Sequence, residues 1–332
     1  MSDAVGAADR DVCFDVDGTA TYGTVHIPAH GAGQRLAAAL LLAGSGPTDR
    51  NGDVPCLNVN PRTLRLIAGV LGALGIMSLR FDKYFSGQTG GGAYAKDPAK
   101  IDLDAYIRQA IAGYDALRAQ PEAREEALLI AGHSEGGLYA LLLARSVRPR
   151  PAGVALIQPQ ADRLLSSIEL QATEQLNAVV AAGQHEPAVA ARNAEGIKRA
   201  IGDFRAGRLV NVTGLLPEIV RLLAPGLLSA TNERYVRADD AVRPTAVAAG
   251  IAPGTRVLVT AGTMDINVPV PTIRPLADAL VKAGTTGPGL RVLEGVDHFL
   301  HEAGEERSGS SLAPAVVAAL TEWAGPYAVA RP

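Results

Sequence analysis

Hydrophobic residues along the chain gather in short runs that alternate with longer amphipathic stretches. The aliphatic runs lie at residues 36–43, 76–81, 127–131, 153–158, 256–261 and 290–293. Helical patterns lie at 62–74, 101–119, 135–145, 273–283 and 312–323. Because buried parallel strands are short and aliphatic, and their crossovers are helical, this alternation predicts an α/β fold. We expect a mostly parallel central sheet with helices on both faces.

The N-terminal region has a different rhythm. Residues 12–28 alternate between apolar and polar positions, and Asp17-Gly18 stands at the middle of the segment. An Asp-Gly pair between alternating runs favours a two-residue turn between antiparallel strands. We therefore predict an N-terminal antiparallel hairpin at an edge of the sheet.

The alternation stops between residues 159 and 253. Helical patterns follow one another there, at 168–182, 188–205 and 215–228, without a clear strand run. A structureless loop of this length is implausible inside a compact fold. The sequence therefore predicts an inserted helical lid (cap) subdomain at 160–252. The core domain is expected to comprise residues 1–159 and 253–332.

Composition excludes several classes of partner. The net charge is −3 and the 31 Lys and Arg are scattered along the chain, which argues against nucleic acid. The only cysteines, Cys13 and Cys56, lack the spacing of a metal site or a disulfide framework. No apolar run approaches the length of a membrane-spanning helix, and the first residues do not resemble a signal peptide. We expect a cytoplasmic protein without a metal, a membrane or a nucleic-acid partner; the sequence leaves a homodimer open.

Residues 128–138 carry the strongest chemical motif. They read LLIAGHSEGGL, so that an aliphatic run ends in a G-x-S-x-G pattern and continues into a helical one. In a strand-to-helix turn of this kind the serine hydroxyl is presented at the top of the sheet. This setting favours Ser134 as a nucleophile over the alternative of an ordinary glycine-rich turn.

A serine nucleophile needs a base, and a histidine is the usual one. Four of the six histidines lie near the N-terminus, beside the serine or in the insertion: His26, His30, His133 and His185. The other two follow the last predicted strand, in the segment EGVDHFLHEAG. His298 comes first and is the preferred base, with His301 in reserve. His133 flanks the serine and is expected to point elsewhere.

The acid that orients the histidine should lie between serine and histidine in the chain. Asp265 follows the strand at 256–261, with Gly262 opening the turn. Asp297 is the rival because it neighbours His298, but adjacent side chains on an extended segment diverge. We predict Asp265, whose alternative role is to cap its own loop.

An oxyanion hole requires two backbone N–H groups near the serine. After the strand at 36–43 the sequence reads GSGPTDRNGD, in which glycines let the amides turn inward. We predict the N–H groups of Ser45 and Glu135 as the donors. The loop matches neither G-x-G-x-x-G nor G-x-x-x-x-G-K-[ST], so a phosphate-binding loop and a nucleotide cofactor are not expected.

Together these features resemble the α/β-hydrolase superfamily, and more narrowly the bacterial serine esterases and serine-aminopeptidase-like hydrolases. The residues that carry the resemblance are the elbow GHSEGG, the loop AGSGPTDRNGD, the run LRFDKYFSGQTG and the order Ser134, Asp265, His298. The resemblance implies an α/β-hydrolase fold, a catalytic triad, an acyl-enzyme and a small-molecule acyl substrate, with no cofactor. Ala43, where many members carry His, and RFDKYFSG, in place of RxDxRGxGxS, depart from the family pattern.

Three functions remain open from the sequence. The first is a serine hydrolase that cleaves a carboxylic ester. The second keeps the same triad in an acyltransferase, a thioesterase or an amidase or peptidase, because the lid chooses the acceptor. The third is a binding protein without catalysis on a hydrolase scaffold.

Overall fold

The structure, a computed structural model, describes residues 4–302, 304 and 311–329. The chain forms two compact units. Unit 1 comprises Met1–Ala95, Tyr106–Ala161 and Pro244–Pro332, and unit 2 comprises Lys96–Ala105 and Asp162–Arg243.

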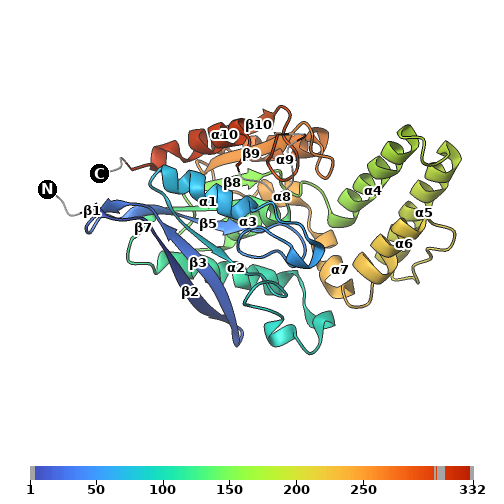
Figure 1. Cartoon of the computed structure of the whole chain (residues 1–332), viewed down its shortest axis with the longest axis horizontal. Coiled ribbons are helices and arrows are strands. Elements are labelled where there is room, and N and C mark those ends of the chain that lie inside the picture. Colours follow the sequence, from blue (N-terminus) through green and yellow to red (C-terminus); the bar gives the residue numbers. More distant parts are fainter. Residues whose placement is uncertain (1–3, 303, 305–310, 330–332) are drawn as a thin grey trace. The chain divides into compact units, whose positions relative to one another are not determined.

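Unit 1 is built on an eight-stranded sheet with the order β10-β9-β8-β7-β5-β6-β3-β2 (Figure 1). Neighbouring strands run parallel from β10 to β6, and only β3 and β2 are antiparallel to their neighbours. The mostly parallel sheet is thus confirmed. The strands are β2 (Ala8–Val16), β3 (Thr19–Ile27), β5 (Leu36–Leu42), β6 (Met77–Phe81), β7 (Ala123–His133), β8 (Gly153–Ile157), β9 (Arg256–Gly262) and β10 (Thr286–Leu293).

The hairpin β2–β3 lies at the edge of this sheet, as predicted. Its register runs from Ala8 opposite Ile27 to Val16 opposite Thr19. Asp17 and Gly18 have φ angles of 52° and 79°, and two positive φ angles are what a two-residue type I′ turn requires. A separate pair of short strands, β1 (Ala4–Val5) and β4 (His30–Gly31), was not predicted.

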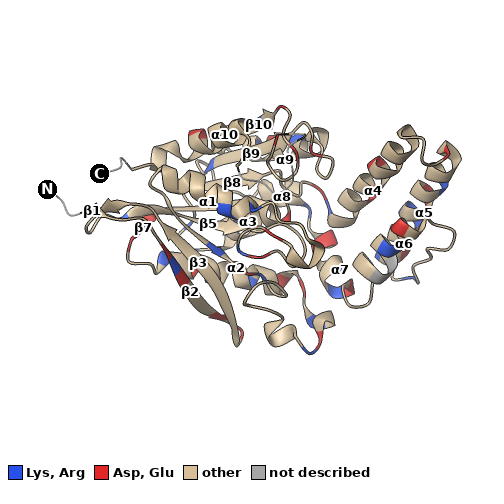
Figure 2. Cartoon of the chain, in the orientation of Figure 1, with Lys and Arg blue, Asp and Glu red and all other residues tan. Residues whose placement is uncertain are grey.

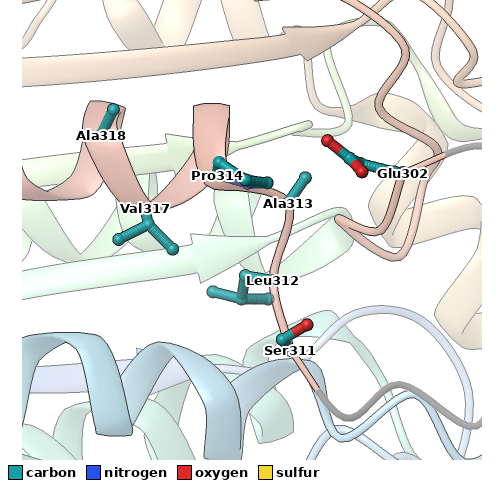
Figure 3. Close-up of a pocket in the computed structure, with 7 residues that line it drawn as sticks. All are labelled: Glu302, Ser311, Leu312, Ala313, Pro314, Val317 and Ala318. Carbon is teal, nitrogen blue, oxygen red and sulfur yellow. The ribbon is translucent and has the colours of Figure 1, made fainter.

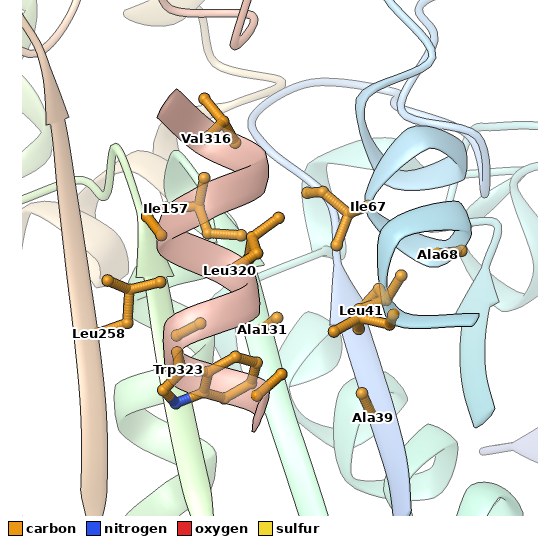
Figure 4. Close-up of a cluster of buried hydrophobic side chains, with 14 of the residues drawn as sticks. Ala39, Leu41, Ile67, Ala68, Ala131, Ile157, Leu258, Val316, Leu320 and Trp323 are labelled. Carbon is orange, nitrogen blue, oxygen red and sulfur yellow. The ribbon is translucent and has the colours of Figure 1, made fainter. Parts of the chain in front are cut away.

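Helices cover both faces of the sheet. Alternate residues of β5 point to opposite faces, and Ala39 and Leu41 contribute to a core with α1 and α10 (Figure 4). On the other face Leu40 lies against α2, where a Cβ at Gly113 would stand 3.4 Å from it. The helices of unit 1 are α1 (Thr63–Ala73), most of α2 (Leu103–Arg118), α3 (Glu135–Ser146), α8 (Pro244–Ala248), α9 (Val270–Lys282) and α10 (Pro314–Ala324).

The centre of the sheet is free of charge. Figure 2 shows no Lys, Arg, Asp or Glu on β5 or β8, whose sequences are LAAALLL and GVALI. Every residue of both strands is buried, as expected for parallel strands covered on both faces. Charged residues do occur on other strands, such as Arg10 and Asp11 on the edge strand β2 and the buried Arg80 on β6.

Unit 2 is helical. It holds α4 (Leu164–Ala181), α5 (Pro187–Arg205), α6 (Pro217–Leu222), a π-helical segment (Leu223–Leu227) and α7 (Glu233–Ala241). A single helix over 215–228 was predicted, and this is wrong, because Gly226 has non-helical angles of φ −95° and ψ −109°. The unit has an apolar core of its own, which includes Leu165, Leu176, Ile197, Ile201, Phe204, Leu223 and Val236.

A buried carboxylate joins the helices of unit 2. Asp240 on α7 accepts two hydrogen bonds from the Arg205 guanidinium, each of 2.9 Å, at the end of α5. It also accepts from Arg163, at 2.7 Å, and from the backbone N–H of Leu165, at 2.9 Å, where α4 begins. One carboxylate thereby fixes three helix ends.

The unit boundaries differ from the predicted ones at 160 and 252. Residues 96–105 belong to unit 2, because Asp102 pairs with Arg234 at 2.7 Å. Helix α8 belongs to unit 1, because it packs on α3 and α9. Short 3-10 helices complete the described chain: Pro55–Leu57, Gly92–Tyr94, Pro98–Lys100 and Gly325–Tyr327. Within the described residues, no helix is both long and apolar enough to cross a lipid bilayer.

Candidate active site

Ser134 occupies a sharp turn at the carboxyl edge of the sheet. Strand β7 ends at His133 and α3 begins at Glu135, so that Ser134 alone makes the connection. Its angles are φ 56° and ψ −122°, a conformation that costs a non-glycine residue about 1–3 kcal/mol. The turn is held by the Ser134 N–H, which donates to the Ile157 carbonyl at 3.0 Å, and by the Ser134 carbonyl, which accepts from the Gln160 N–H at 2.9 Å.

The glycines of the motif allow three elements to approach one another. A Cβ at Gly132 would overlap the Gly136 carbonyl, and a Cβ at Gly136 would overlap the carbonyls of Leu42 and Ala43 at the end of β5. These overlaps are with backbone atoms, which cannot move aside without displacing β5 or α3. The G-x-S-x-G spacing is therefore a steric requirement of this turn.

The structure brings Ser134, His298 and Asp265 together in a chain of hydrogen bonds. The Ser134 Oγ lies 3.2 Å from His298 Nε2, and His298 Nδ1 lies 2.8 Å from Asp265 Oδ2. The other carboxylate oxygen of Asp265 accepts from the N–H groups of Asn267 and Val268, each at 2.8 Å. An ionised Asp265 makes Nδ1 the protonated nitrogen, which leaves Nε2 free to accept the serine proton.

Asp297 and His301, the alternatives to Asp265 and His298, lie outside the hydrogen-bond chain of Ser134. Asp297 accepts a hydrogen bond from the His301 N–H at 2.9 Å and so caps the turn after His298. The His301 ring is buried, and its nitrogens have no hydrogen-bond partner among the described residues. Neither side chain joins the hydrogen-bond chain of Ser134.

His133 has a structural contact that the sequence did not reveal. Its Nε2 donates to the backbone carbonyl of His298 at 2.8 Å, and the two rings lie 5.0 Å apart. Burial, reinforced by repulsion from His298, lowers the pKa of His133 to about 3. The ring is therefore neutral at neutral pH and supports the backbone of His298 without adding charge. No pattern in the sequence links these two residues, which are 165 positions apart.

The loop after β5 passes beside the serine. A Cβ at Gly44 would lie 3.2 Å from the Ser134 Cβ. The next residue, Ser45, accepts a hydrogen bond at its carbonyl from the Thr48 hydroxyl at 2.7 Å, and Gly46 has a φ of 77°. Ser45 and Glu135, the predicted oxyanion donors, thus belong to the two segments that adjoin Ser134.

A pocket at the start of α10 is a separate feature (Figure 3). It is lined by Glu302, Ser311, Leu312, Ala313, Pro314, Val317 and Ala318. None of the predicted site residues is among this lining, so the pocket contributes nothing to the arrangement around Ser134.

The described residues offer no cluster of three or more His, Cys, Asp or Glu side chains that could hold a metal ion. Cys13 and Cys56 are both free and exposed.

Searches against protein-family models and curated protein sequences found no match. Solved structures do match over nearly the whole chain. Est1E from Butyrivibrio proteoclasticus, bound to ferulic acid, is 16% identical, with 95% of this chain and 98% of that chain covered and a TM-score of 0.60.

Two further structures give the same result. The esterase Pf2001 of Pyrococcus furiosus is 14% identical, covers 97% of this chain and 91% of its own, and has a TM-score of 0.58. The α/β hydrolase GrgF from Penicillium sp. sh18 is 18% identical, covers 88% and 91%, and has a TM-score of 0.55. With the sheet order and the strand-to-helix turn at Ser134, these likenesses show that the chain has the α/β-hydrolase fold.

Proposed function

We propose that this protein is a serine hydrolase that cleaves a carboxylic ester of a small molecule. The observation that carries the proposal is the continuous hydrogen-bond chain from Ser134 through His298 to Asp265, with distances of 3.2 and 2.8 Å. A serine hydroxyl alone is a weak nucleophile at neutral pH, and such a chain supplies the base and the group that orients it.

The reaction proceeds in two halves. Ser134 Oγ attacks the ester carbonyl while its proton moves to His298 Nε2, and the N–H groups of Ser45 and Glu135 bind the developing oxyanion. The C–O bond to the alcohol then breaks, and His298 returns the proton to the departing alcohol, leaving an acyl-enzyme. Water then attacks the acyl carbon while its proton moves to His298 Nε2. The bond from the acyl carbon to Ser134 Oγ breaks, His298 returns the proton to Oγ, and the acid leaves. Each oxyanion donor contributes on the order of 3 kcal/mol in the transition state.

Esterases among the proteins of similar fold support an ester as the substrate. Pf2001 is an esterase of this fold, and Est1E, which has the same fold, binds ferulic acid in its structure. We assign the enzyme to the cytoplasm, because a reducing compartment suits its two exposed free thiols, Cys13 and Cys56.

Labelling with a fluorophosphonate, followed by peptide mapping, tests the proposal. We expect one label per chain, on Ser134, and none in the Ser134→Ala variant. A panel of p-nitrophenyl esters, thioesters and anilides of the same acids then ranks the leaving groups, and an added alcohol separates hydrolysis from acyl transfer. An unlabelled wild-type protein, or Ser134→Ala with unchanged turnover, would refute the assignment; reversible ligand binding without a covalent adduct would favour a binding protein.

A further inference from the structure

Lys83 is a buried lysine just beyond the end of β6. Its side chain is 5% exposed, and a buried ammonium is stable only when it has polar partners. The Nζ donates to the carbonyl oxygen of Gly44 and lies 3.3 Å from Glu135 Oε2. These partners belong to the two segments on either side of Ser134, the loop after β5 and the first turn of α3.

Aromatic rings complete the surroundings of this ammonium. Its Nζ lies 5.6 Å from the ring centre of Tyr106 and 5.9 Å from that of Tyr139, within the range of cation–π attraction. The Tyr139 hydroxyl donates to Glu135 Oε2 at 2.9 Å, the same oxygen that faces Lys83. The Glu135 side chain is 4% exposed, so both charges of the pair are held in fixed positions.

The contact with the Gly44 carbonyl has a direct effect on Ser45. The carbonyl of Gly44 and the N–H of Ser45 belong to one planar peptide unit, in which the C=O and the N–H point in opposite directions. An ammonium that holds the oxygen therefore fixes the direction of the N–H. Since a Cβ at Gly44 would lie 3.2 Å from the Ser134 Cβ, this peptide adjoins the nucleophile.

We propose that Lys83 is a positioning residue for the oxyanion hole. Its ammonium anchors the Gly44–Ser45 peptide so that the Ser45 N–H faces the reacting oxygen, and Glu135 balances the charge while its own N–H supplies the second donor. This proposal rests on the serine hydrolase function proposed above. Lys83 touches no reacting atom; it acts through the peptide that it holds.

Kinetics of Lys83→Met, which keeps the aliphatic length and removes the charge, test the role. Lys282→Met, at an exposed position on α9, is the matched control. Rates are normalised to active sites counted with the fluorophosphonate. We expect Lys83→Met to lower kcat about 100-fold, as loss of one oxyanion donor does, with KM within about threefold of wild type. Lys83→Arg, which retains a cationic donor, should restore part of the loss.

Two ketones separate positioning from a general structural role. A trifluoromethyl ketone analogue of the best ester forms a hemiketal oxyanion with serine, whereas the unfluorinated ketone binds without one. In Lys83→Met the affinity for the first should fall by the same factor as kcat/KM, and that for the second should not change. Equal losses for both ketones, or an unchanged trifluoromethyl ketone affinity, would overturn the proposal. If Lys83→Met does not fold, the double variant Lys83→Met/Glu135→Gln, which leaves neither charge buried alone, takes its place.

Amide hydrogen exchange at Ser45 gives a readout without catalysis. We expect faster exchange at Ser45 in Lys83→Met, or in the double variant if that one takes its place, than in Lys282→Met. Unchanged exchange would reject the anchoring of this peptide, whatever the protein hydrolyses. Faster exchange in a protein that hydrolyses no ester and takes no label would reject the serine hydrolase function and retain the anchoring.

Discussion

Replacement of His133 by glutamine should remove a large part of the protein's loss of stability in acid. The pKa of His133 falls from the ordinary 6.5 to about 3 in the folded chain, mainly through burial. Between these pH values the unfolded chain binds a proton that the folded chain does not, so stability is lost as the pH falls below 6.5. At pH 5.0 this single group destabilises the folded state by about 2 kcal/mol relative to pH 7.5.

Glutamine suits the test because its amide N–H₂ can replace the Nε2 donor that reaches the His298 carbonyl, at 2.8 Å in the wild type, and because it does not titrate. Urea unfolding of wild type and His133→Gln at pH 7.5 and 5.0 gives four free energies of unfolding. Any loss of packing appears at both pH values and cancels in the difference. We expect the wild type to lose about 2 kcal/mol more than the variant. Parallel losses would show that His133 is not the source of the acid sensitivity.

Four other substitutions, of which Gly69→Ala is a control, test the site and the two units. Asp265→Asn should lower kcat roughly a thousandfold or more, because the amide no longer holds His298 in the required tautomer, with Ser134 still in place; a loss under tenfold would contradict this role. Gly132→Ala should lower the urea midpoint of unfolding, because the added methyl group overlaps the Gly136 carbonyl. Gly69→Ala, in open space on α1, is the control and should raise the free energy of unfolding by about 0.5–1 kcal/mol. Equal effects of the two substitutions would contradict the steric argument. Asp240→Asn leaves two arginines without their shared partner and should cost unit 2 about 2 kcal/mol. The single tryptophan, Trp323, lies in unit 1 and reports on that unit by its fluorescence. In Asp240→Asn the helical circular dichroism should therefore begin to fall at a lower urea concentration than the Trp323 fluorescence changes. Coincident unfolding curves would refute the separate weakening of unit 2.

The elements of the sheet were predictable where the local pattern was strong. The aliphatic strand at 36–43 and the helix at 135–145 correspond to β5 and α3, because burial on both faces, or along one helix side, leaves a periodic trace in the sequence. Strand β7 was predicted at 127–131 but begins at Ala123. Its first residues include the exposed Glu125 and Glu126, and these charges conceal the beginning of the strand.

The inserted region was less predictable. Helix α7 was not predicted, and the break at Gly226 was missed, because the leucines on both sides suggest one continuous helix. Asp102, 132 positions from Arg234, joins unit 2 through an ion pair between segments that carry no local sign of association.

By itself the sequence determined the strand-to-helix turn at Ser134 and the candidates Asp265 and His298, because glycine spacing and position after a strand are local properties. Only the tertiary structure decided that His298 reaches Ser134, that Asp297 caps a turn, and that His133 and Lys83 support the site. The contacts of Lys83, His298 and His133 join residues 39 to 165 positions apart, whereas that of Asp297 spans four positions. The energy of these contacts depends on burial and on the direction of single hydrogen bonds. Neither property can be predicted from the order of hydrophobic and polar residues along the chain.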